Sequence, residues 1–149
     1  MTSFHSFCSP AAALEAHTQG LLENSMPLRQ YQELIGWQKS RALVAEIYRH
    51  TQSFPSNEIY GLTSQLRRAA VSIPSNIAEG QGRLTRGEFK QFLGHARGSA
   101  FEVETQLLIA EDLGYLDRQS TERLLRQVQE VGRILSGLLA SLNRVRTSP

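Results

Sequence analysis

The feature that most constrains the fold of this 149-residue chain is an apolar heptad seam near its C-terminus. Its positions alternate at spacings of four and three: Leu124, Val128, Val131, Leu135, Leu138, Leu142 and Val145. A stripe with this spacing buries one face of an amphipathic helix against other helices. It predicts a helix over residues 117–146 that begins at Asp117 and packs inside a helical bundle.

Three earlier segments also carry apolar residues at helical spacing, and they predict helices over about 34–53, 58–82 and 85–113. Boundary signals flank them: Phe54-Pro55 stops the first, Asn57 can cap the second, Thr85 with Glu88 forms a capping box for the third, and Gly114 offers a left-handed stop. Gly80 and Gly82 are expected to end the second helix. Pro74 lies inside that helix, where it removes the hydrogen bond to the Ala70 carbonyl and is expected to kink the axis.

The links between these helices are short, and short links place consecutive helices antiparallel. No segment shows the alternation of a strand. The sequence therefore predicts an all-α, up-down-up-down four-helix bundle over residues 31–149. Residues 1–30 are rich in Ser, Ala, Thr and Pro without a helical period, and are interpreted as a mostly irregular or disordered N-terminal extension. Met26 is compatible with an alternative start, and a short docked helix around Ala11–Leu22 is the other interpretation.

Composition argues against several classes of protein. Cys8 is the only cysteine, so an intramolecular disulfide is impossible and a cysteine-based metal site is not expected. No apolar run has the roughly 18 residues of a membrane helix, and no signal-peptide pattern opens the chain, so the expected compartment is the cytoplasm.

Signatures of catalysis are absent from the sequence. A ferritin-like metal centre needs Glu-x-x-His on two helices, whereas Glu46 and His50 are four apart and His95 has Phe92 at the relevant position. Gly80-Gln81-Gly82 lacks the Lys and Ser or Thr of a phosphate loop, and no nucleophile context appears. We expect no enzymatic activity, no metal and no cofactor.

Basic residues gather in the second and third predicted helices. The candidate nucleic-acid-binding residues are Arg67, Arg68, Arg83, Arg86, Lys90 and Arg97. A basic stripe spanning one end of the bundle would attract phosphates, with an affinity that falls steeply with salt. The alternative is a solvated face with local pairs, such as Arg83 with Glu79.

Small and polar residues mark two further places. Gly94 and Gly98 form a small-residue strip that would let another helix approach, inside the bundle or across a subunit boundary, and Gly132 and Gly137 invite the same interpretation. The polar residues Ser72, Ser75 and Asn76 around Pro74 are expected to satisfy carbonyls freed by the proline.

The stretch from Tyr60 to Gly80 closely resembles the four-helix-bundle family of ribosomal-RNA intervening-sequence proteins. Supporting matches are Trp37-Gln38-Lys39, Glu88-Phe89, Phe92-Leu93, Glu104 to Leu107 and Gly114-Tyr115-Leu116, and the resemblance covers roughly residues 31–145. Within the central string, the residues interpreted as a motif of bundle geometry are Ser72, Pro74, Ser75, Asn76, Glu79 and Gly80.

The resemblance implies a homo-oligomer, in particular a pentameric barrel, and a nucleic-acid role. Family relatives that accompany reverse transcriptases in diversity-generating retroelements resemble basic pentamers that bind the polymerase and nucleic acid. The partners that the resemblance implies are therefore RNA, DNA, a reverse transcriptase or another protein. We therefore expect a scaffold that self-assembles into a ring and associates with nucleic acid, RNA in preference. The alternative is a protein–protein interaction module without nucleic-acid binding.

Overall fold

The computed structural model of the chain describes residues 30–144. The chain divides into one unit of residues 1–30 and a second of residues 31–149. Apart from Gln30, the predicted N-terminal extension lies outside the described residues, as does Val145 at the end of the heptad seam. All the regular structure in the described part of the second unit is helical.

Four α-helices and two short 3₁₀ helices follow one another along the described residues. The elements are η1 (Gln30–Glu33), α2 (Ile35–Thr51), η2 (Ser56–Glu58), α3 (Leu62–Gln81), α4 (Arg86–Asp112) and α5 (Arg118–Arg144). The prediction of an all-α fold with four helices is confirmed. The largest difference in a boundary is at the start of α3, which begins at Leu62 and not near residue 58.

The late start of α3 has a local cause. Residues 56–58 form the separate turn η2, and the Glu58 carboxylate accepts a hydrogen bond from the Leu62 backbone N–H at 2.9 Å. Glu58 therefore satisfies one of the N–H groups that the first turn of α3 leaves without a helical partner. The expectation that Asn57 caps this helix is wrong, because Asn57 lies inside η2 and Gly61 occupies the N-cap position.

The boundary signals at Thr85, Gly114 and Asp117 act as expected, whereas Gly80 lies inside α3 and only Gly82 follows its end. The Thr85 hydroxyl oxygen accepts from the Glu88 backbone N–H at 3.2 Å and donates to the Glu88 carboxylate at 2.7 Å. Gly114 adopts φ of 73°, the left-handed conformation that glycine tolerates best. Asp117 accepts from the Ser120 backbone N–H at 2.8 Å, directly before α5.

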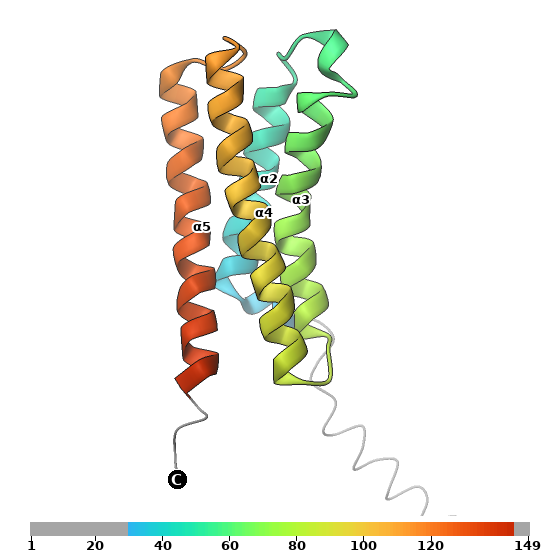
Figure 1. Cartoon of the computed structure of the whole chain (residues 1–149), viewed down its shortest axis with the longest axis vertical. Coiled ribbons are helices and arrows are strands. Elements are labelled where there is room, and N and C mark those ends of the chain that lie inside the picture. The colour runs from blue at the N-terminus through green and yellow to red at the C-terminus, as the bar shows by residue number, and fades with distance from the viewer. Residues whose placement is uncertain (1–29, 145–149) are drawn as a thin grey trace, which may run out of the picture. The chain divides into compact units, whose positions relative to one another are not determined.

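The four helices lie side by side, with the α2–α3 and α4–α5 connections at one end and the α3–α4 connection at the other (Figure 1). Helix α3 packs on α2 and α4, and α5 packs on α4 and α2, which closes a ring of neighbours. At the end with two connections, the Tyr115 hydroxyl donates to the Glu58 carboxylate at 3.1 Å and the Tyr115 ring lies 5.5 Å from that of Phe54.

The core lies between the four helices and includes Leu124, Val128, Val131 and Leu135 of the predicted heptad seam. Its largest fully buried side chains are Leu43, Ile47, Leu66, Ile73, Ile77, Leu93, Val103, Leu107, Leu124, Val128, Val131 and Leu135. Helix α3 continues through Pro74, and the kink expected there stays a prediction. Among the described residues, no helix has the length and apolarity needed to cross a bilayer.

Candidate nucleic-acid interface

The six predicted cations do not form one cluster at one end of the bundle. Two contacts between α3 and α4 show where these cations lie along the length of the bundle: Ser72 contacts Ser99, and Gly80 contacts Phe92. Arg67 and Arg68 therefore lie toward the end with two connections, roughly 20 Å along α3 from its last residue. Arg83 and Arg86 flank the α3–α4 connection at the other end, Lys90 follows them, and Arg97 lies midway along α4.

Arg67 is held against the bundle by two contacts. Its Nε donates a hydrogen bond to Oγ1 of buried Thr51 at 2.8 Å, and its guanidinium lies 4.7 Å from the ring centre of Tyr48. These contacts join α3 to α2 and turn the guanidinium toward the protein. Arg68 is exposed and lines a polar groove of about 400 Å³ between α3 and α4, together with Glu102.

Arg83 forms the local pair that the alternative interpretation anticipated. Its guanidinium makes an ion pair with Glu79 one turn earlier, and it also lies 4.6 Å from the ring centre of Phe92. An exposed ion pair of this kind contributes little to stability. The negative charge of Glu79 nevertheless offsets the positive charge that Arg83 presents to solvent. Arg83 is thus the one candidate cation that forms an ion pair with a carboxylate among the described residues.

Three cations remain on one face of α4, and we call Arg86, Lys90 and Arg97 the α4 basic stripe. Spacings of four and seven residues place them along one side of the helix over roughly 16 Å. Arg86 and Arg97 are exposed and Lys90 is partly exposed, and none of the three makes an ion pair with another described residue. The stripe is therefore available to an anionic partner.

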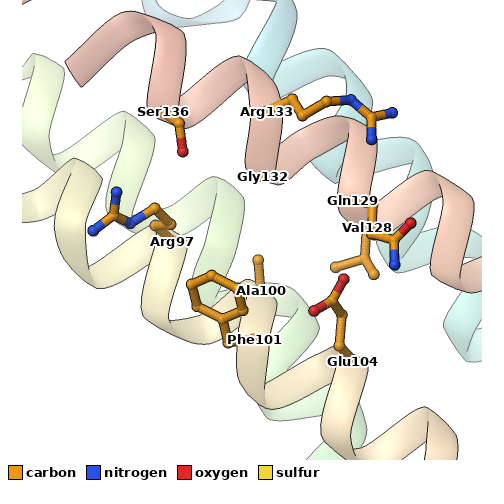
Figure 2. A pocket seen from close by; sticks show the side chains of 9 residues that line it. All are labelled: Arg97, Ala100, Phe101, Glu104, Val128, Gln129, Gly132, Arg133 and Ser136. Carbon is orange, nitrogen blue, oxygen red and sulfur yellow. The ribbon is translucent and has the colours of Figure 1, made fainter. Parts of the chain in front are cut away.

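A groove of about 380 Å³ continues from the α4 basic stripe and lies between α4 and α5 (Figure 2). It is lined by Arg97, Ala100, Phe101 and Glu104 of α4 and by Val128, Gln129, Gly132, Arg133 and Ser136 of α5. Arg133 and Phe101 were not among the residues predicted from the sequence. Periodicity could have found Phe101, which stands four residues after Arg97 and one position outside the apolar stripe of α4.

Polar residues near Pro74 connect α3 to α4. The Ser72 and Ser99 hydroxyls are 2.9 Å apart, and the Asn76 amide donates to the Ser72 carbonyl at 2.8 Å and to the Ser72 hydroxyl at 2.9 Å. The expectation that these side chains satisfy the Ala70 carbonyl freed by Pro74 is wrong, since Asn76 bonds Ser72 and Ser75 points to solvent as an exposed residue. The cluster joins two helices.

The glycine strip on α4 does not serve packing inside the bundle. A Cβ placed on Gly94, Gly98, Gly132 or Gly137 would meet no heavy atom within 4 Å beyond its own helix backbone. The closest approach of another α-helix to a glycine in the described residues occurs at Gly80, where a Cβ would stand 2.7 Å from the Phe92 Cβ. The expectation that the strip lets a helix approach inside the bundle is therefore wrong. A contact across a subunit boundary stays a prediction.

Ionisable groups with shifted pKa values lie at helix ends, away from the α4 basic stripe. Hydrogen bonds from the Ser120 backbone and hydroxyl lower the pKa of Asp117, and the hydrogen bond to Glu58 raises the pKa of Tyr115. Among residues 30–144, no three His, Cys, Asp or Glu side chains gather in a group that could hold a metal ion. The pKa shifts of Asp117 and Tyr115 arise from a helix-capping contact and a loop contact, respectively.

Comparison with known proteins gives a family and a fold. The model of the 23S rRNA-intervening sequence protein family matches residues 32–137. A solved structure of a protein of unknown function from the S23 ribosomal protein family of Bacteroides thetaiotaomicron VPI-5482 superposes with a TM-score of 0.66 at 22% identity. The match covers 70% of this chain and 98% of that one, and at this identity it shows the fold alone.

No curated protein matches the chain. The family match nevertheless covers most of the described bundle, from the end of η1 through most of α5, and includes the stretch around Pro74 that carried the resemblance. The chain belongs to the family of 23S rRNA-intervening sequence proteins.

Proposed function

We propose that this chain is a non-enzymatic helical-bundle scaffold that self-assembles into a ring and associates with nucleic acid, RNA in preference. The observation that carries the nucleic-acid part is the α4 basic stripe, whose three cations share one helix face and have no carboxylate partner among the described residues. Arg133, across the groove from Arg97, adds a fourth positive charge to the same side. Cations spaced along one helix face are able to contact successive phosphates of a nucleic-acid strand.

The choice of cations differs from the sequence prediction in its emphasis. Arg67 uses its Nε–H for the Thr51 hydroxyl, so it has fewer N–H groups left for a phosphate. The positive charge of Arg83 is offset by its ion pair with Glu79. Because counterions are released when phosphates are neutralised, each phosphate contact adds to the salt dependence of binding. We expect a slope set by the α4 basic stripe, with log K falling by roughly 0.7 per contact for each tenfold rise in salt on a single strand.

The test is binding of nuclease-treated protein to fluorescein-labelled RNA, followed by anisotropy over a salt series. Arg86→Glu with Lys90→Glu should weaken binding strongly and flatten the salt slope. The matched control is Arg118→Glu with Arg126→Glu, which changes net charge equally on α5. Equal losses in both double variants would show a general charge effect and remove the stripe from the proposal, and no binding by the wild type at low salt would refute RNA association.

Self-assembly is supported by apolar side chains at the end of the bundle with two connections. Ile59, Tyr60, Leu108, Ile109 and Leu113 are all exposed there, and Tyr60 retains 94% of its accessible surface. We call these five residues the apolar end. Gatherings of this kind on a soluble protein mark contact surfaces. The pentameric form is carried over from the family resemblance.

Light scattering tests the assembly. The chain mass is 16.7 kDa, so a pentamer would give about five times that value. Tyr60→Ser with Leu113→Ser should reduce the mass, whereas Leu84→Ser should leave it unchanged, because Leu84 is 99% exposed at the opposite end. A wild-type mass of one chain at micromolar concentration would refute the ring.

A second candidate function is a protein–protein interaction module without nucleic-acid binding. The apolar end favours it, because the same exposed residues could bind a different protein, for example a polymerase, as readily as a second copy. A one-chain mass together with no RNA binding would favour this second candidate. A multimer that binds RNA would favour the first.

A further inference from the structure

Phe101 is an exposed aromatic residue on a face that already carries cations. It retains 61% of its accessible surface, lines the α4/α5 groove, and follows Arg97 by one helical turn. The bundle core does not use this ring, since Ala100 and Val103 fill the adjacent buried positions of α4. The ring is therefore available to a partner in the groove.

The groove exists because two lining residues are small. Ala100 is the buried residue of α4 at this level, and Gly132 faces it from α5. A Cβ placed on Gly132 would have no heavy atom within 4 Å, so α5 leaves open space where another side chain would stand. A flat group can lie there against the Phe101 ring.

Polar groups surround this open space on both helices. Arg97 and Arg133 come from different helices, and Glu104 and Gln129 are the other polar side chains toward the α5 start (Figure 2). Aromatic rings beside cations are the combination that binds single-stranded nucleic acid, because the ring stacks on a base while the cations contact the flanking phosphates. A-form duplexes keep their bases stacked inside and cannot offer one to such a ring.

We infer that the α4/α5 groove binds one unpaired base of single-stranded RNA, stacked on Phe101, with the neighbouring phosphates at Arg97 and Arg133. This inference rests on the proposed function and adds the substrate class. The Glu104 carboxylate repels phosphate, so it faces the base edge, where it accepts hydrogen bonds from ring or amino N–H groups. The Gln129 amide can donate and accept beside it.

The experiment compares a labelled 12-nucleotide oligo-A RNA with a blunt 12-base-pair RNA duplex, by anisotropy on the full chain. Gly132→Leu fills the groove while keeping every charge, and leucine is a better helix former than glycine. The matched control is Gly137→Leu, on the same helix at a position equally open but outside the groove. We expect Gly132→Leu to weaken single-strand binding by tenfold or more, with duplex binding unchanged and Gly137→Leu without effect on either.

Removal of the ring gives a second, independent variant. Phe101→Ala should weaken oligo-A binding by roughly 5- to 150-fold, the range found for aromatic rings that stack on a base. Its control is Ile35→Ala, which truncates an apolar side chain of similar exposure, 62%, outside the groove. Duplex binding should be the same in both variants.

Each failure has its own signature. If the wild type binds neither RNA, the proposed function fails and this inference fails with it. If the wild type binds RNA but Gly132→Leu and Phe101→Ala behave as their controls, only the groove assignment is overturned. It is also overturned if either groove variant lowers the mass seen in light scattering, because the groove would then hold another protein chain.

Discussion

Gly80 of α3 lies so close to Phe92 of α4 that a Cβ on Gly80 would stand 2.7 Å from the Phe92 Cβ and 3.0 Å from the Phe89 ring. Gly80 is buried, and Gly82 is the residue that follows the end of α3. The glycine allows the two helices to approach closely beside the α3–α4 connection. The α4 basic stripe begins at this connection, so the contact positions Arg86 and Lys90.

Substitution of Gly80 tests this approach. Gly80→Ala gains helix propensity of about 1 kcal/mol but overpacks the contact, which typically costs about 1–3 kcal/mol, so the net change should be destabilising. Gly98→Ala is the control, since a Cβ there meets nothing within 4 Å, and it should stabilise by up to about 1 kcal/mol. Urea unfolding measures both, and a stabilised Gly80→Ala variant would show that the helices have room there.

The hydroxyls of Ser72 and Ser99 should be energetically coupled. They are 2.9 Å apart and join α3 to α4, with Asn76 bonded to the same Ser72 hydroxyl. Each single change to Ala should destabilise by about 1 kcal/mol, and the double variant by less than the sum of the two. A double-mutant cycle measures the coupling. The exposed Ser75 supplies the control, because a cycle of Ser75→Ala with Ser99→Ala should be additive.

Arg67 and Arg68 should differ in their effect on stability although they are adjacent. Arg67 loses a hydrogen bond to buried Thr51 and a contact with the Tyr48 ring when changed to Ala, which we expect to cost about 1–2 kcal/mol. Arg68→Ala removes an exposed side chain and should stay within about 0.5 kcal/mol. Thermal unfolding compares the two variants, and equal melting temperatures would contradict the structural role of Arg67.

The division between Arg67 and Arg68 shows where sequence reasoning stops. The heptad seam and the capping signals at Thr85 and Gly114 were readable because each depends on residues a few positions apart. The partner of Arg67 is Thr51, sixteen residues earlier on another helix, and no local pattern names it. A prediction based on charge alone therefore grouped Arg67 with Arg86, although the fold places them toward opposite ends of the bundle.

The glycines illustrate the same limit on the candidate site. A buried glycine at a helix crossing and an exposed one facing solvent look alike in a sequence, so Gly80 was interpreted as a stop and Gly98 as a packing position. The facing helix decides, because Phe92 approaches Gly80 and no side chain approaches Gly98 within 4 Å. For the same reason the α4/α5 groove could not be predicted, since Gly132 opens it only opposite Ala100.

Asp117 should make the start of α5 sensitive to acid. Its pKa is lowered below its ordinary value, first by the hydrogen bond from the Ser120 backbone N–H and then by that from the Ser120 hydroxyl. A carboxyl with a depressed folded-state pKa contributes stability that is present above its unfolded pKa and is lost as pH falls through the folded value. Asp117→Asn still accepts the backbone hydrogen bond but cannot ionise, so stability measured by urea unfolding should fall less steeply for this variant than for the wild type below pH 4. An unchanged acid dependence would show that the Asp117 carboxylate has the same pKa in the folded and unfolded chains.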